Sequence, residues 1–87
     1  MLFFVKNRLF MEKMEEFIQK TAAGEVVSPA DYGTIYCSSA DPGVGYVIFD
    51  VENREKLDSI LAQLEPYSEV YEVAYVLTLE EFQQSMM

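Results

Sequence analysis

The spacing of apolar residues changes from a strand period to a helix period within residues 46–64. Residues 46–51 are mostly β-branched or aromatic, which favours a strand whose alternate side chains form a buried face. Residues 54–64 repeat apolar side chains every three or four positions, which predicts a helix with one apolar face. That face consists of Leu57, Ile60, Leu61 and Leu64. Asn53 can cap the start of this helix, and Pro66 ends it.

A similar succession of periods opens the chain. Residues 2–9 predict a first strand, and residues 10–22 predict a helix that follows it. The expected buried stripe of that helix is Met14, Phe17, Ile18 and Thr21. Residues 34–38 predict a second strand, which the turn-forming residues 41–43 join to the strand at residues 46–51 as a hairpin.

The final part of the chain predicts a strand over residues 68–77 and a short helix after it. Thr78 and Glu81 have the spacing of a capping box, so the helix is expected to run to about Ser85. Two strand–helix–strand halves with right-handed crossovers predict one α+β domain over residues 1–87. The expected architecture is a ferredoxin-like sandwich with an antiparallel sheet in the order 4-1-3-2 and two helices on one face.

The two faces of this sheet differ in whether the helices of the same chain cover them. The face under the helices should hold Phe3, Val5, Val47, Phe49, Val51, Tyr71 and Val73. The uncovered face should hold Phe4, Lys6, Arg8, Tyr46, Ile48, Asp50, Val70, Glu72, Ala74 and Val76. Much of the second set is apolar, and 51% of the 87 residues are hydrophobic. A second sheet packed on this face would bury its apolar side chains. The sequence therefore predicts a homodimer that forms a dimeric α/β barrel, with a higher oligomer as an alternative.

The charge and the composition of the chain exclude several classes of binding partner. The chain has 6 basic and 15 acidic residues, a formal charge of −9, which argues against nucleic acid or an anionic membrane as partner. No apolar run approaches the roughly 18 residues of a membrane span. Cys37 is the only cysteine and there is no histidine, so the sequence predicts no disulfide within the chain, no metal site and no cofactor. A lone cysteine fits the reducing cytoplasm.

A family resemblance rests on four short stretches of the chain. They are Met1-Leu2-Phe3 with Val5-Lys6, Phe49-Asp50-Val51, Gln63-Leu64 with Pro66-Tyr67, and Glu72-Val73. These stretches resemble muconolactone isomerase-like proteins of the dimeric α/β-barrel superfamily. The end of the chain, from Leu57 through Tyr71-Glu72-Val73 to Leu77-Thr78-Leu79-Glu80-Glu81, is similar to small uncharacterised domains of the same superfamily. The resemblance implies a homodimer with a pocket between sheet and helices. The isomerases typically carry a histidine where this chain has Phe4.

Three charged residues are the candidates for catalysis. Lys6, Asp50 and Glu72 are expected to converge on the uncovered face, where a lysine between carboxylates could transfer protons or orient a ligand. The alternative is a charge cluster that neutralises itself in the dimer interface or at its rim.

The candidate ligand-binding residues are aromatic and aliphatic. They are Phe4, Tyr36, Tyr46 and Ile48, which could line an aromatic pocket or fill the dimer interface. Cys37 lacks a histidine to activate it, so a packing role is expected. Asn7 and Asn53 are assigned structural roles.

Two functions follow from these residues. The first is a binding or assembly module for a small apolar or aromatic ligand. The alternative is a cofactor-independent isomerase or monooxygenase that acts on a small aromatic-derived metabolite. The absence of histidine favours the binding module, because histidine is the usual general base at neutral pH.

Overall fold

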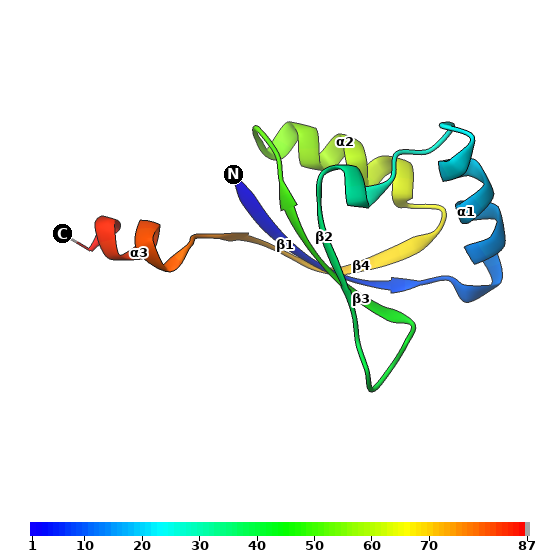
Figure 1. The fold of residues 1–87 in the computed structure, drawn as a ribbon, viewed down its shortest axis with the longest axis horizontal. Coiled ribbons are helices and arrows are strands. Elements are labelled where there is room, and N and C mark those ends of the chain that lie inside the picture. Colours follow the sequence, from blue (N-terminus) through cyan, green and yellow to red (C-terminus); the bar gives the residue numbers. More distant parts are fainter. Residues whose placement is uncertain (87) are drawn as a thin grey trace.

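The computed structural model describes residues 1–86 and has an α+β fold with a four-stranded antiparallel sheet and three α-helices (Figure 1). Its elements are β1 (Leu2–Leu9), α1 (Met14–Ala22), β2 (Gly33–Cys37), β3 (Val44–Asp50), α2 (Arg54–Leu64), β4 (Ser68–Val76) and α3 (Leu79–Ser85). Short 3-10 turns lie at Met11–Lys13 and Pro29–Asp31. Every predicted strand and helix is present, with small differences at the ends. Across residues 1–86, no helix has the length and hydropathy that a membrane span requires.

The sheet has the strand order β2-β3-β1-β4, and each neighbouring pair is antiparallel. Counted from the other edge, this order is 4-1-3-2. Val5 in β1 lies opposite Val47 in β3 and Val73 in β4. Ile35 in β2 also lies opposite Val47, so these side chains share one face of the sheet.

The hydrophobic core lies between that face and α2. Its members are Phe3, Val5, Val47, Phe49, Val51, Leu57, Ile60 and Leu64. Burial of each such side chain stabilises the fold by about 1.5–3 kcal/mol. Asn53 caps α2 by accepting a hydrogen bond from the Lys56 N–H at 2.9 Å. The predicted strand face, helix stripe and cap are therefore confirmed.

α1 does not cover the sheet in the way the sequence predicts. It stands at the end of the sheet beyond β1, whereas α2 lies across the strands (Figure 1). None of its residues is buried, and Ile18 of the expected stripe is 59% exposed. Phe17 packs its ring against Tyr67, with the centroids 5.2 Å apart. The expectation of a buried Ile18 is wrong because α1 contacts the rest of the domain through Phe17 and leaves Ile18 in solvent.

A bulge in β4 changes two of the predicted side-chain orientations. The register against β1 shifts between Lys6 and Asn7, so an extra residue of β4 interrupts the alternation. Val70 lies opposite Asn7 and therefore faces α2, not the uncovered face. The Tyr71 hydroxyl accepts a hydrogen bond from Arg8 Nε at 3.1 Å, which places Tyr71 on the uncovered face. Both assignments correct the strict alternation that the sequence suggested.

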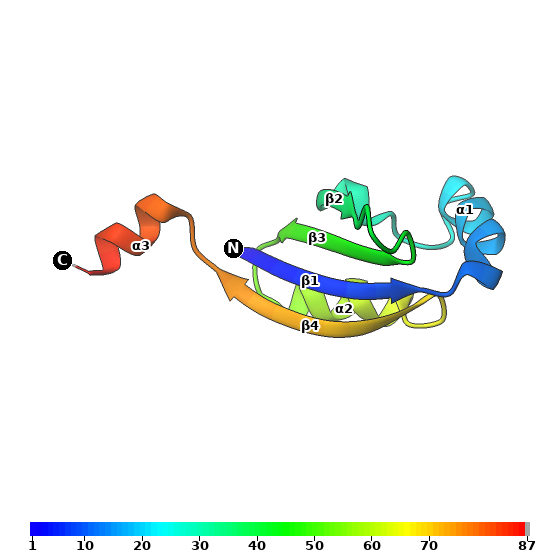
Figure 2. The same cartoon turned by 90° about the horizontal axis from the view of Figure 1, so that it is seen from below.

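The chain ends in a C-terminal arm, residues 77–86, that carries α3 away from the sheet (Figures 1 and 2). The predicted capping box is confirmed. The Glu81 N–H donates to Thr78 Oγ1 and the Thr78 N–H donates to Glu81 Oε1, both at 3.1 Å.

Candidate functional site

A pocket of about 250 Å³ lies between α1, the β2–β3 hairpin and the covered face of the sheet. It exists because α1 stands at the end of the sheet and leaves part of that face unfilled. Its walls are mostly apolar. They include Leu9, Met14, Phe17, Ile35, Val47 and Leu64. This is the place between sheet and helices where a small ligand would find apolar contacts.

Asn7 in β1 brings a polar group into this pocket. The residue is only 9% exposed, yet its side-chain amide forms no hydrogen bond with any other described residue among 1–86. An amide offers two donor hydrogens and one acceptor oxygen. No side-chain nitrogen or oxygen among the described residues is both fully buried and without a partner, so the Asn7 amide keeps contact with the open space of the pocket. The Asn7 amide is therefore available to a molecule in the pocket.

Gly45 makes room for this amide. It lies directly opposite Asn7 in β3 and also lines the pocket. A Cβ atom at position 45 would come within 2.8 Å of Asn7 Oδ1, closer than real Cβ contacts allow. A glycine inside a strand can mark such a close approach, and this was the one sequence signal of the site.

Two of the hydroxyl groups that line the pocket already have hydrogen-bond partners. Thr21 Oγ1 donates to the carbonyl oxygens of Phe17 and Ile18 at 3.0 Å. Ser68 Oγ donates to the Leu64 carbonyl oxygen at 3.4 Å. These hydroxyls already have partners, so Asn7 is the polar group best placed to orient a ligand.

The pocket has no carboxylate, ammonium or guanidinium group among its described lining residues. Cys37 and Tyr67 are the lining residues that can ionise. The geometry supports binding of a neutral molecule more than proton transfer.

The predicted ligand-binding residues lie on the other side of the sheet. Phe4 pairs with Ile48, and Tyr36 pairs with Tyr46, so the four side chains form neighbouring rows on the uncovered face. The rings of Phe4 and Tyr46 stack with centroids 6.1 Å apart. The structure brings these four residues together, but none of them lines the pocket.

The predicted catalytic residues do not all converge. Lys6 lies opposite both Tyr46 and Glu72 on the uncovered face. Asp50 lies opposite Leu2, four residues along β1 and therefore about 13 Å from the row of Lys6. Its carboxylate lies 3.5 Å from the N-terminal amino group. A three-residue charge centre is thus not formed, because strand register separates Asp50 from the other two.

An ion pair at the rim of the uncovered face was missed by the sequence analysis. Arg8 Nη2 donates to Asp41 Oδ2 at 2.6 Å, and Arg8 Nε donates to the Tyr71 hydroxyl. The hydrogen bond from Arg8 lowers the pKa of Asp41, and the Gly43 N–H adds to the effect. The same bond raises the pKa of Arg8. The cluster ties β1, β4 and the hairpin loop together, and its role is structural.

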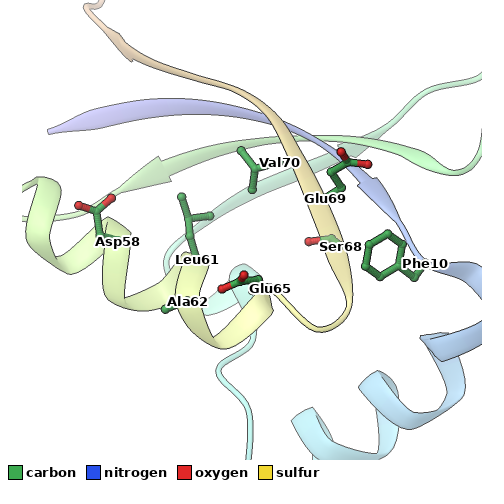
Figure 3. Close-up of a pocket in the computed structure, with 8 residues that line it drawn as sticks. All are labelled: Phe10, Asp58, Leu61, Ala62, Glu65, Ser68, Glu69 and Val70. Atoms are coloured by element: carbon green, nitrogen blue, oxygen red, sulfur yellow. The ribbon is translucent and has the colours of Figure 1, made fainter.

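A second, larger hollow lies between α2 and β4 (Figure 3). It is an open groove of about 620 Å³ with apolar side chains from Phe10, Leu61 and Val70. Three carboxylates border it. They are Asp58, Glu65 and Glu69. Among residues 1–86, no group of acidic residues and cysteine has the geometry of a metal site.

Comparisons of the chain with protein-family models, curated proteins and solved structures find no match. The function is therefore argued from the pocket and the surfaces of the fold.

Proposed function

We propose that this protein is a small-molecule binding module whose ligand occupies the pocket beneath α1. The observation that carries the proposal is the unpartnered Asn7 amide in an otherwise apolar pocket of about 250 Å³. A dry cavity of about 150 Å³ can hold benzene. The volume here suits one substituted ring or a short branched chain. The amide would bind a carbonyl, carboxamide or hydroxyl group on such a molecule.

The proposal extends to the fold family and to the assembly. The succession of elements and the sheet order support a ferredoxin-like topology. The apolar side chains on the uncovered face support a homodimer in which two sheets form a dimeric α/β barrel. These features are consistent with a relationship to the muconolactone isomerase-like proteins. The lack of charged side chains in the pocket favours binding over isomerase or monooxygenase chemistry.

The binding proposal can be tested by filling the pocket from its rim. Cys37 is exposed, lines the pocket and lies opposite Gly45, so the Cys37→Trp side chain would occupy the space over Asn7. Saturation-transfer NMR should show benzamide and toluene bound to the natural protein and absent from Cys37→Trp.

Ile18→Trp is the matched control, because Ile18 is exposed on α1 and is not among the residues that line the pocket. This variant should bind both compounds as the natural protein does. Binding that survives Cys37→Trp, or no binding of either compound to the natural protein, would contradict the proposed site.

A further inference from the structure

The C-terminal arm exposes a stripe of large apolar side chains. Leu79, Phe82 and Met86 are spaced three and four residues apart along α3, so they share one side of the helix. Their exposed fractions are 71%, 51% and 72%. Exposed apolar surface of this kind, gathered on one element, is typical of an interaction site.

Within residues 1–86, no hydrogen bond ties this helix to the sheet or to the other helices. Both views show α3 beyond the end of the sheet, apart from α1 and α2 (Figures 1 and 2). An isolated helix shorter than about 12 residues is marginal in water, even with good caps. The seven residues of α3 therefore need a surface to pack against.

The arm continues an apolar surface that begins on the sheet. Ala74 and Val76 lie opposite Phe4 and Leu2 on the uncovered face, and the chain passes directly from Val76 into the arm. A surface that covers the uncovered face of the sheet would thus reach the arm as well.

The size of the uncovered face supports a role for the arm in pairing. Four strands about 4.8 Å apart, with β1 rising about 3.3 Å per residue over its eight residues, give a face of roughly 500 Å². A stable interface buries about 800 Å² on each partner. The sheet face falls short of that area, and the arm can supply the remainder.

Charge selects the surface on which the arm can dock. The arm carries Glu80 and Glu81, and no basic residue follows Lys56 in the sequence. The groove between α2 and β4 is bordered by Glu65 and Glu69, which have no ion-pair partner among residues 1–86, and by Asp58, which is paired with Arg54. Its two unpaired carboxylates repel an acidic helix.

The uncovered face carries Lys6, which forms no ion pair with any of residues 1–86, but Glu72 lies opposite Lys6 in β4, and Arg8 is paired with Asp41. Charge therefore disfavours the groove and is close to balanced along the Lys6 row of the uncovered face.

We propose that the arm of one copy packs its Leu79–Phe82–Met86 stripe along the edge of the uncovered sheet face of a second copy, beside the contact between the two sheets. In a two-fold dimer this contact is reciprocal, so each arm packs on the sheet of the other copy. This inference rests on the proposed homodimer and is independent of the proposed ligand pocket, because the arm and the pocket lie on different parts of the molecule.

Sedimentation of the full chain tests the energetic role of the stripe. Phe82→Ala should weaken the dimer at least about tenfold, since a buried aromatic anchor contributes strongly to an interface. Gln84→Ala is the matched control, because position 84 lies about half a turn away from the stripe. Its dissociation constant should equal that of the natural protein. A natural protein that sediments as a monomer at micromolar concentration, or equal constants for all three proteins, would overturn the inference.

Photo-crosslinking tests where the arm docks. A benzophenone amino acid replaces Phe82, and isotopically heavy and light copies of that full-length protein are mixed. Crosslinks between heavy and light chains are expected at the edge strands of the uncovered face, at Tyr36 in β2 or at Ala74 and Val76 in β4. Crosslinks only within one chain, or to the groove residues Leu61 and Val70, would refute the proposed docking surface even if a dimer forms.

Discussion

Asn7 gives the pocket its one side-chain amide among the lining residues described, and this amide has no hydrogen-bond partner within residues 1–86. Its position in the central strand β1 fixes the amide against the core, and Gly45 keeps the space beside it open. A side chain that serves only the fold would find a hydrogen-bond partner within the fold, as Asn53 does with the Lys56 N–H. The Asn7 amide is therefore free to bind the proposed ligand.

Replacing this amide should separate stability from binding. Asn7→Leu keeps a similar shape and removes an amide that has no protein partner and is not fully buried, so the free energy of unfolding should change by less than about 1 kcal/mol. The variant should bind benzamide several-fold more weakly and toluene at least as well. Urea denaturation and ligand titration by NMR measure the two effects. A variant that is less stable, with unchanged preference between the two compounds, would show that Asn7 serves the fold alone.

The sequence predicts residues with local roles better than residues with tertiary roles. The Asn53 cap and the Thr78–Glu81 capping box depend on partners three residues away, and both are confirmed. Asn7 has no such local pattern. Its role depends on Gly45, which is distant in the sequence, and on the placement of α1. The alternation of apolar and polar residues along the chain does not show which distant residues will lie beside Asn7.

At the scale of elements, α1 and β4 show why the hydrophobic pattern of the sequence predicted the orientation of some side chains and not of others. The helix stripe of α1 was present, but the position of the helix at the end of the sheet left Ile18 exposed. The bulge in β4 turned Val70 toward α2 and Tyr71 away from it. Both outcomes depend on contacts between segments distant in sequence, which a periodic pattern does not encode.

The link between β1 and the hairpin loop should make stability depend on pH. Arg8 lowers the pKa of Asp41 in the folded state, so folding favours the ionised carboxylate. This contribution is present above the unfolded-state pKa of about 3.9 and is lost as the pH falls through the lower folded-state pKa. Asp41→Asn should therefore be less stable than the natural protein at neutral pH, and the difference should shrink in strong acid.

Chemical denaturation at several pH values measures this dependence. Asp31→Asn is a suitable control, because Asp31 is exposed and its side chain has no hydrogen bond among residues 1–86. A constant difference between natural protein and Asp41→Asn at every pH would rule out a contribution from the ionised carboxylate. A difference equal to that of Asp31→Asn would rule out the Arg8 contact as its source.

At the scale of the whole molecule, the apolar uncovered face predicts self-association. Ile48 lies near the middle of that face, opposite Phe4 and Thr34. Ile48→Glu should convert the proposed dimer to a monomer, because a charge buried between two apolar sheets without a partner costs several kcal/mol. Sedimentation at micromolar concentration, with circular dichroism to verify folding, provides the measurement.

Ser59→Glu supplies the comparison for that experiment. Ser59 is exposed on α2, on the opposite side of the sheet, and receives the same added charge. This variant should remain a dimer. If Ile48→Glu also remains a dimer of unchanged stability, the uncovered face is not the interface.

The placement of α1 also bears on how quickly the pocket can exchange its contents. The helix contributes no buried residue to the core, whereas α2 contributes Leu57, Ile60 and Leu64. Elements with few buried contacts open locally at a free energy far below that of global unfolding. α1 is thus expected to move away from the pocket more readily than α2 and the sheet. The dissociation rate of a ligand would then follow the local opening of the nine-residue helix α1, and not the global unfolding of the protein.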